Sequence, residues 1–390
     1  MFIDLRDSKD AFSSAIKVPF FSPLITSSDK NSVLKTLNSS LLTDGPVLRN
    51  FEEAFAKFTG TKYAVGVSNA TSALHLSLKS LGIGGGDEVI VPNMTFVATI
   101  NAVILTGATP VIADVNEDLN ISSKSVINSI TKKTKAILPV HFAGKMCDMN
   151  VLTKIARTDN LLIIEDCAHA LGSTLHKQHA GSFGDAGCFS FYPTKNITTI
   201  EGGMVITNSK KVAERIRVLR NHGIAKSLSQ RYNHGKPWDY DITEPGYNYR
   251  LDEVRSSLGL NQLKSLTQLN QRRRKAFQYY SDKLKPIIGI TPLTQSDSGH
   301  ACHLYIIRVK KEFGTSRDKL FKKLLMRGIR TSVHYKPLSK FSTYRKYVRV
   351  DNKLENSESA YNEILSLPFY PQISKREQDF VIKCIRECNV

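Results

Sequence analysis

The sequence predicts an α/β protein: a large domain with a mostly parallel central sheet covered by helices, and a smaller C-terminal α/β domain. Short, fully apolar segments alternate with helical stretches between residues 63 and 164. This alternation is typical of parallel strands that are buried on both faces. The 390 residues are enough for a large core, and strand and helix patterns resume after residue 302.

The N-terminal elements are predicted to be helical. Residues 1–17 are polar and mixed, so we expect an extension with little structure of its own. Residues 27–29 (Ser-Ser-Asp) are helix-capping types that precede apolar residues at helical spacing. A second helix is indicated by Phe51, Phe55 and Phe58, which fall on one face and precede a glycine at position 60.

The alternation of strands and helices begins after this second helix. The expected strands are 63–67, 88–91, 109–113, 136–140 and 161–164, and the expected helices are 73–81, 96–106 and 149–157. In open sheets of this kind, ligands bind beyond the carboxyl ends of the strands. Residues that follow these strands are therefore the first candidates for a functional site.

One lysine, Lys195, lies between two segments that read as buried strands, 189–191 and 204–207. Desolvation lowers the pKa of such an amine and makes it a nucleophile. An exposed loop lysine is the alternative. Gly202 and Gly203, which follow it, and the acidic residue described next favour a role in chemistry.

Two further stretches suggest ligand contacts. Asp166 ends a predicted buried strand, and His169 follows three residues later. From its position, Asp166 can orient a ring nitrogen, bind a metal or cap a helix. Residues 68–72 (Ser-Asn-Ala-Thr-Ser) lead from a strand into a helix, which suits an anion. An ordinary N-cap at Asn69 or Ser72 is the alternative reading.

The second half of the chain is helix-rich. We expect helices at 210–220, 251–263, 266–284, 316–327 and 375–388, strands at 302–309 and 329–334, and a long loop at 221–247. A loop of that length is more often functional or mobile than not. We place the domain change after residue 265, so the expected domains are 18–265 and 266–390.

Charge and cysteine content restrict the class of protein. The net charge of +19 is compatible with nucleic-acid binding, but the basic residues are spread at helical surface spacing, so a solvated surface that attracts phosphates is preferred. The six cysteines form no CxxC pair, so we expect reduced thiols and no metal site. Without a signal peptide or a bilayer-spanning segment, a cytoplasmic location without membrane insertion is expected.

Short motifs in a fixed order add a more specific signature. They are Leu42-Thr-Asp-Gly-Pro46, Val67-Ser-Asn-Ala-Thr-Ser-Ala-Leu74, Pro92-Asn-Met-Thr-Phe-Val-Ala-Thr99, Glu165-Asp-Cys-Ala-His-Ala170, Ser190-Phe-Tyr-Pro-Thr-Lys195 with Glu201-Gly-Gly203, Gly246-Tyr-Asn-Tyr-Arg250, Val333-His-Tyr-Lys-Pro337 and Leu367-Pro368. With them, the chain from about residue 18 onward resembles the DegT/DnrJ/EryC1/StrS family of sugar aminotransferases, which have fold type I and depend on pyridoxal phosphate.

The resemblance implies roles for the two central residues. Lys195 is similar to the lysine that forms the Schiff base with the cofactor and then moves protons between carbon and nitrogen. Asp166 is similar to the carboxylate that keeps the pyridinium nitrogen protonated, so that the ring accepts electrons. One branch of the family replaces the lysine with histidine and performs dehydration, and Lys195 argues against that branch.

The resemblance also implies the remaining contacts of the cofactor. His169 stands near the ring hydroxyl, and Phe96 matches the aromatic residue stacked on the ring. Ala70, Thr71 and Ser190 match the phosphate contacts.

Other residues resemble contacts made across subunits or with substrate. Asn248 matches a residue that reaches the phosphate from the neighbouring subunit, which implies a homodimer with shared active sites. Arg250, His334 and Tyr335 are expected to contact substrate.

The implied reaction is a transamination. An amino acid, usually L-glutamate in this family, donates nitrogen to the keto group of a nucleotide-linked sugar. Residues 68–72 and 334–337 resemble enzymes that aminate C4 of 4-keto-6-deoxy hexoses. Two alternatives stay open: amination at C3, and a regulator of the same fold that binds the cofactor without turnover.

Overall fold

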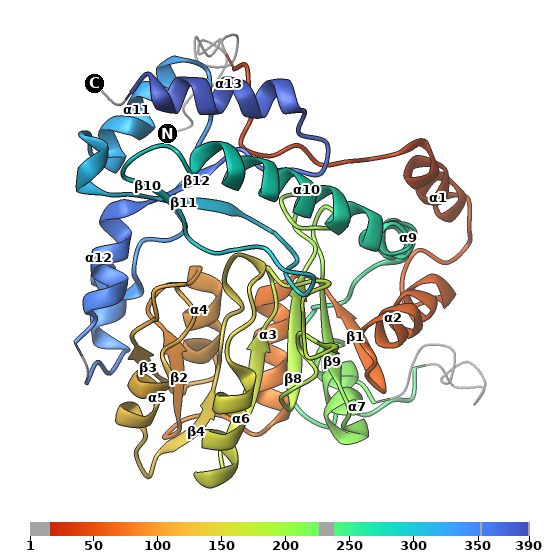
Figure 1. Cartoon of the computed structure of the whole chain (residues 1–390). Coiled ribbons are helices and arrows are strands. Elements are labelled where there is room, and N and C mark those ends of the chain that lie inside the picture. The colour runs from red at the N-terminus through yellow and green to blue at the C-terminus, as the bar shows by residue number, and fades with distance from the viewer. Residues whose placement is uncertain (1–15, 226–237, 352, 389–390) are drawn as a thin grey trace, which may run out of the picture.

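Two larger β-sheets organise the described chain, and β6 (Thr174–Leu175) with β7 (Gln178–His179) forms a third, two-stranded sheet. The structure is a computed structural model that describes residues 16–225, 238–351 and 353–388. Most of the predicted extension 1–17, and residues 226–237 of the predicted long loop, lie outside the described residues. In Figure 1 the larger sheet occupies the lower half of the molecule, and the smaller sheet lies above it with α10 and α13.

The larger sheet has seven strands in the order β1-β9-β8-β5-β4-β2-β3. They are β1 (Tyr63–Val67), β2 (Glu88–Pro92), β3 (Thr109–Ala113), β4 (Thr134–Ile137), β5 (Leu162–Asp166), β8 (Ala186–Ser190) and β9 (Gly203–Thr207). Among the described strands of this sheet, only β9 runs antiparallel to its neighbours. The predicted mostly parallel sheet is confirmed.

Helices cover both faces of this sheet. The elements are α2 (Pro46–Thr59), α3 (Ala70–Ser80), α4 (Val97–Leu105), α5 (Ser123–Ser129), α6 (Met149–Thr158) and α7 (Lys210–Leu219). Apolar residues of α3, α4 and α7 form one buried cluster with Val89 and Val91, while α5 and α6 pack with Ile90 on the other face. Successive residues of β2 thus point to opposite, equally buried faces, which explains the continuous apolar segment Val89–Val91.

Local sequence sets the bounds of the first two helices. The N-cap of α1 (Ser27–Leu37) is Thr26, one residue before the predicted capping run, and it forms a capping box with Asp29. The end of α2 is confirmed at Gly60, which has a φ of 71°. This left-handed conformation favours glycine. Phe51 and Phe55 are fully buried and the half-buried Phe58 packs against the same core cluster, so the predicted shared face is confirmed.

The C-terminal unit contains a three-stranded antiparallel sheet in the order β10-β11-β12. Its elements, with the helices leading to it, are α9 (Glu253–Leu263), α10 (Leu266–Leu284), β10 (Ile290–Pro292), β11 (Tyr305–Val309), α11 (Arg317–Met326), α12 (Glu355–Glu363), β12 (Ile364–Leu367) and α13 (Lys375–Arg386). The smaller α/β unit is confirmed, and the exact domain bounds stay a prediction.

The predicted strand at 329–334 is wrong. Ile329 forms an isolated parallel bridge with Val18, and Ser332 forms an isolated antiparallel bridge with Ser366. This stretch therefore pairs one residue with each of two different neighbours, so no continuous ladder forms. It then leads to His334 and Tyr335, which lie near the edge of the larger sheet.

The cysteines and the apolar helices bear on two further expectations. All six cysteines are buried and none forms a disulfide, as predicted. Among the described residues, no helix is both long and apolar enough to cross a bilayer.

Candidate active site

The candidate residues meet at one edge of the larger sheet. β5 ends at Asp166 and β8 ends at Ser190, and the two strands are parallel. β1, which shares their direction, ends immediately before the turn into α3, and β2 leads to Phe96 at the start of α4. The carboxyl ends of parallel strands lie at the same edge. The fold thereby brings together residues that are far apart in the sequence.

Gly203 places Ser190 beside the N-terminus of α3. Gly203 pairs with Val67 of β1 on one side and with Ser190 of β8 on the other. A Cβ atom at Gly203 would lie 2.5 Å from the carbonyl carbon and oxygen of Asn69 and 2.9 Å from the nitrogen of Ala70. Only glycine allows this close approach of backbone to backbone.

The N-terminus of α3 is capped and still offers backbone donors. Asn69 Oδ1 accepts the N–H of Ser72 at 2.8 Å, so the ordinary N-cap reading is correct. Ala70 and Thr71 occupy the first turn, where N–H groups have no intrahelical acceptor and the helix dipole favours an anion. With the neighbouring Ser190 hydroxyl, this turn suits a phosphate group.

Asp166 is a buried carboxylate at the carboxyl end of β5. Thr99 Oγ1 donates to its Oδ2 at 2.8 Å, and the Ala168 N–H donates to its Oδ1 at 3.1 Å. Burial raises the pKa of Asp166 in spite of these hydrogen bonds and of the positive charge of Lys195. A positively charged group that donates a hydrogen bond to Asp166 would therefore stabilise the ionised form of this carboxylate. Thr99 was not singled out from the sequence, although it ends one of the quoted motifs.

Lys195 lies in the loop that joins β8 to β9, and it is half-buried. Burial lowers its pKa from 10.5 to about 8, while the negative charge of Asp166 acts in the opposite direction. A larger share of neutral amine is therefore present near neutral pH than in an exposed lysine. Asp166 at the end of β5 and the loop after β8 that carries Lys195 lie at the same edge of the sheet, so the fold brings these two candidates together.

His169 and Tyr335 form a hydrogen-bonded pair in the same site. The Ala143 N–H donates to His169 Nδ1 at 3.3 Å, so the neutral ring carries its proton on Nε2, which lies 3.0 Å from the Tyr335 hydroxyl. Burial, and then the charge of Lys195, hold the pKa of His169 well below its ordinary value. Burial likewise raises the pKa of Tyr335. Both side chains are therefore neutral near pH 7.

Phe96 has an open ring face beside this pair. Its side chain is 56% exposed, which is unusual for phenylalanine, and its ring lies 5.9 Å from that of Tyr335. An exposed aromatic face at the site edge is suited to stacking on a flat ligand.

The other candidates occupy the surroundings of this site. The His334 ring stacks on Phe20, and its Nδ1 forms a hydrogen bond with Ser366 Oγ at 2.8 Å. Burial, and then the charge of Lys195, lower the pKa of His334 to about 3. Arg250 donates to Asn221 Oδ1 at 2.7 Å. Asn248 is exposed. Its predicted contact with a neighbouring subunit stays a prediction.

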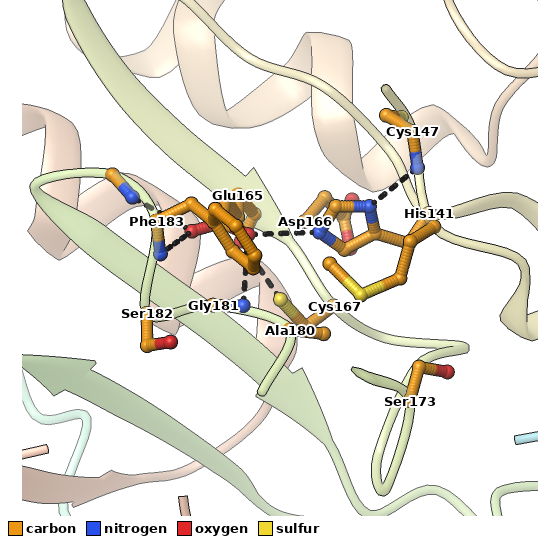
Figure 2. Close-up of polar contacts among 12 residues, drawn as sticks. His141, Cys147, Glu165, Asp166, Cys167, Ser173, Ala180, Gly181, Ser182 and Phe183 are labelled. Carbon is orange, nitrogen blue, oxygen red and sulfur yellow. Dashed lines mark hydrogen bonds and ion pairs between the residues drawn. The ribbon is translucent and has the colours of Figure 1, made fainter. Parts of the chain in front are cut away.

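A second buried cluster lies directly behind Asp166 (Figure 2). The Glu165 carboxylate accepts the N–H groups of Phe183 and Gly184 on Oε1, and the N–H of Gly181 together with His141 Nε2 on Oε2, at 2.8–2.9 Å. His141 Nδ1 in turn accepts the Cys147 N–H at 3.2 Å. Figure 2 shows these donors converging on the carboxylate.

This cluster has the residue types of a metal site but the bonding of a structural network. The ligand atoms of His141, Glu165 and Cys167 lie within 4.8 Å of one another. Both oxygens of Glu165 and both nitrogens of His141 already have hydrogen-bond partners, and burial raises the pKa of the Cys167 thiol well above its ordinary value. A protonated thiol is a poor metal ligand. The geometry favours an anchor for the turn 181–184.

Glu165→Gln is expected to destabilise the protein by about 3 kcal/mol. Either orientation of the new amide places its NH2 group against two buried donors, and each unsatisfied donor costs about 1–3 kcal/mol. Urea unfolding measures the change, and the exposed Glu214→Gln provides a matched control with an expected change under about 0.5 kcal/mol. Parental stability of Glu165→Gln, or a rise in Tm of the native protein with Zn²⁺, would contradict the structural interpretation.

The chemistry of these groups fits pyridoxal phosphate. An amine of lowered pKa suits its aldehyde, the buried carboxylate suits a protonated ring nitrogen, and the exposed Phe96 suits its ring face. The turn at Ala70 and Thr71 with Ser190 suits its phosphate. When bound, this cofactor supplies an electron sink for reactions at an amine-bearing carbon. The fold and the site thus fit the class of pyridoxal phosphate-dependent enzymes.

Comparison with known proteins identifies the family. A model of the DegT/DnrJ/EryC1/StrS aminotransferase family matches residues 23–386. The chain therefore belongs to this family. It is 41% identical over 377 residues to the spore coat polysaccharide biosynthesis protein SpsC of Bacillus subtilis (strain 168), a match that covers 95% of this chain and 96% of SpsC.

Solved structures agree with this result. Helicobacter pylori PseC, an aminotransferase involved in the biosynthesis of pseudoaminic acid, has a TM-score of 0.88 at 32% identity, with coverage of 95% of this chain and 98% of PseC. The putative sugar aminotransferase Spr1654 of Streptococcus pneumoniae in its PLP-form has a TM-score of 0.87 at 32% identity and the same coverage of both chains.

Proposed function

We propose that this enzyme transfers an amino group from L-glutamate to the C4 keto group of a nucleotide-linked deoxy sugar, in the cytoplasm and for polysaccharide biosynthesis. The observation that carries the proposal is Lys195, whose lowered pKa and coupling to Asp166 suit amine chemistry. A histidine at this position would instead match the dehydrating branch of the family.

Several observations support a nucleotide-linked sugar as the acceptor. SpsC is named for spore coat polysaccharide biosynthesis, and Spr1654 is described as a putative sugar aminotransferase. The net charge of +19 favours the approach of a substrate that carries phosphates. The preference for C4 rests on the resemblance of residues 68–72 and 334–337 to C4-specific enzymes.

The active form is proposed to be a homodimer whose subunits share each site. Asn248 is exposed at the surface of a single chain, where it can reach the phosphate of a second copy. Leu34, Leu37, Leu41 and Leu42 are each about half exposed, on α1 and in the segment after it. Exposed apolar side chains gathered along one segment are typical of a contact surface.

A panel of nucleotide-linked keto sugars tests the proposal. With glutamate and a 4-keto-6-deoxy substrate we expect release of 2-oxoglutarate and formation of the 4-amino sugar. Reaction with 3-keto substrates alone would establish the C3 alternative. If glutamate neither changes the visible band of the bound cofactor nor yields 2-oxoglutarate with any substrate, the protein is better described as a cofactor-binding regulator.

A further inference from the structure

His303 enters the candidate site from the C-terminal unit. It lies just before β11 and is 3% exposed. Its ring packs against His169, with ring centroids 4.4 Å apart and an interplanar angle of 32°. The backbone N–H of His303 donates to the carbonyl oxygen of Ala143 at 3.0 Å, and Ala143 is the residue whose own N–H donates to His169. His303 therefore supports His169 through both its ring and its backbone.

Hydrogen bonds to Asn196 fix which nitrogen of His303 carries the proton. Asn196 Nδ2 donates to Asn270 Oδ1 at 2.7 Å and to the Ala301 carbonyl oxygen at 2.9 Å. The amide orientation of Asn196 is thereby set, and its Oδ1 is the atom that faces His303 Nδ1 at 3.1 Å. Since that oxygen only accepts, the proton of the neutral ring must be on Nδ1.

The orientation of the Asn270 amide, at the other end of this hydrogen-bonded network, is also fixed. Asn270 Nδ2 donates to the carbonyl oxygen of Leu171 at 3.0 Å, which fixes the orientation of the Asn270 amide. Donation therefore runs in one direction from His303 through Asn196 and Asn270 to the segment after His169. Such a buried hydrogen-bonded network holds its members in one arrangement.

The state of charge of His303 agrees with this network. Burial is the largest cause that holds the pKa of His303 well below its ordinary value, and the nearby His169 and Lys195 act in the same direction. The ring therefore stays neutral and has a single N–H to give. That N–H is directed to Asn196, the residue that follows Lys195 in the chain.

We propose that His303 is a positioning residue, whose Nδ1–H anchors Asn196 and thereby keeps the adjacent Lys195 amine in its desolvated setting. This inference rests on the proposed role of Lys195. If the anchor is lost, the loop that carries Lys195 is held less tightly and water reaches the amine. The pKa of Lys195 then rises from about 8 toward the value of an exposed lysine.

The test measures the pH dependence of the rate at which the cofactor-free protein binds added pyridoxal phosphate, followed by its visible band. Only the neutral amine reacts, so the midpoint of the profile reports the pKa of Lys195. We expect a midpoint near 8 in the parent. His303→Phe keeps a ring against His169 but removes the N–H, and we expect a midpoint higher by about 0.5–1 unit.

Three further single variants and one double variant separate the hydrogen bond from a purely structural role. His303→Asn places an amide N–H near the position of Nδ1 and should restore the parental midpoint. His303→Gln places its amide near Nε2 and should behave like His303→Phe. Asn196→Ala removes the acceptor from the other side, and combined with His303→Phe it should shift the midpoint no further than either change alone.

Each outcome decides the proposal. A parental midpoint in His303→Phe, an equal shift in His303→Asn, or additive shifts in the double variant would overturn it. Lys195→Ala distinguishes this failure from failure of the proposed function, because a visible band that survives in that variant would contradict the role of Lys195 itself.

Discussion

Lys195→Ala is expected to lower kcat by about 10⁴-fold or more and to abolish the covalent attachment of the cofactor. Among the described residues assigned to this site, Lys195 is the only amine. General acid–base catalysis by a positioned group alone contributes about 10²- to 10⁴-fold. Steady-state turnover with glutamate and the best sugar acceptor measures the rate, and the visible spectrum measures the attachment.

Lys210→Ala is the matched control for this prediction. Lys210 lies at the start of α7 with its side chain 73% exposed, so its removal should leave both the spectrum and the turnover at parental values. Turnover of Lys195→Ala within tenfold of the parent would show that another residue carries the proton transfers.

Asp166→Asn is expected to lower kcat by about 10²- to 10³-fold, a loss comparable to that of a preorganised electrostatic contact. The neutral amide cannot hold a proton on the ring nitrogen, so the cofactor becomes a weaker electron sink. Turnover measured at saturating glutamate, with cofactor occupancy checked by absorbance, separates this effect from weaker binding. The exposed Asp159→Asn should retain parental turnover.

The same variant should change how the stability of the cofactor-free protein depends on pH. Burial raises the pKa of Asp166 above 3.8, so the folded state holds this proton more tightly than the unfolded state does. Asp166 therefore destabilises the cofactor-free protein above its folded pKa, and this penalty is relieved as the pH falls toward 3.8. Unfolding experiments should show that Asp166→Asn removes this contribution. Unchanged kcat and an unchanged pH profile would contradict the role given to Asp166.

Much of the fold could be predicted because its signals are local. Strands buried on both faces carry continuous apolar segments, as in Val89–Val91 of β2 and Leu162–Ile164 of β5, and the phenylalanines of α2 recur at helical spacing. The stretch 329–334 shows where this approach fails, because its apolar residues are used in two single bridges rather than in a ladder. A short apolar run does not indicate which segment of the chain it will pair with.

The site could be predicted only in part for a related reason. Lys195 and Asp166 stand out by their setting between or after buried strands, and the family resemblance supplied their roles. Thr99 is 67 residues from Asp166, and His303 is 107 residues from Asn196, so their contacts arise only when the chain folds. The structural role of Glu165 could not be predicted either, because no local pattern shows that the turn at 181–184 donates hydrogen bonds to its carboxylate.

The most direct test of the site as a whole is to identify the lysine that holds the cofactor. The native enzyme is reduced with borohydride, digested and analysed by mass spectrometry to locate the pyridoxyl group. The structure leads us to expect modification at Lys195, lost when the enzyme is first converted by glutamate to its aminated form. Modification at any other lysine, with Lys195 unlabelled, would contradict the site described here.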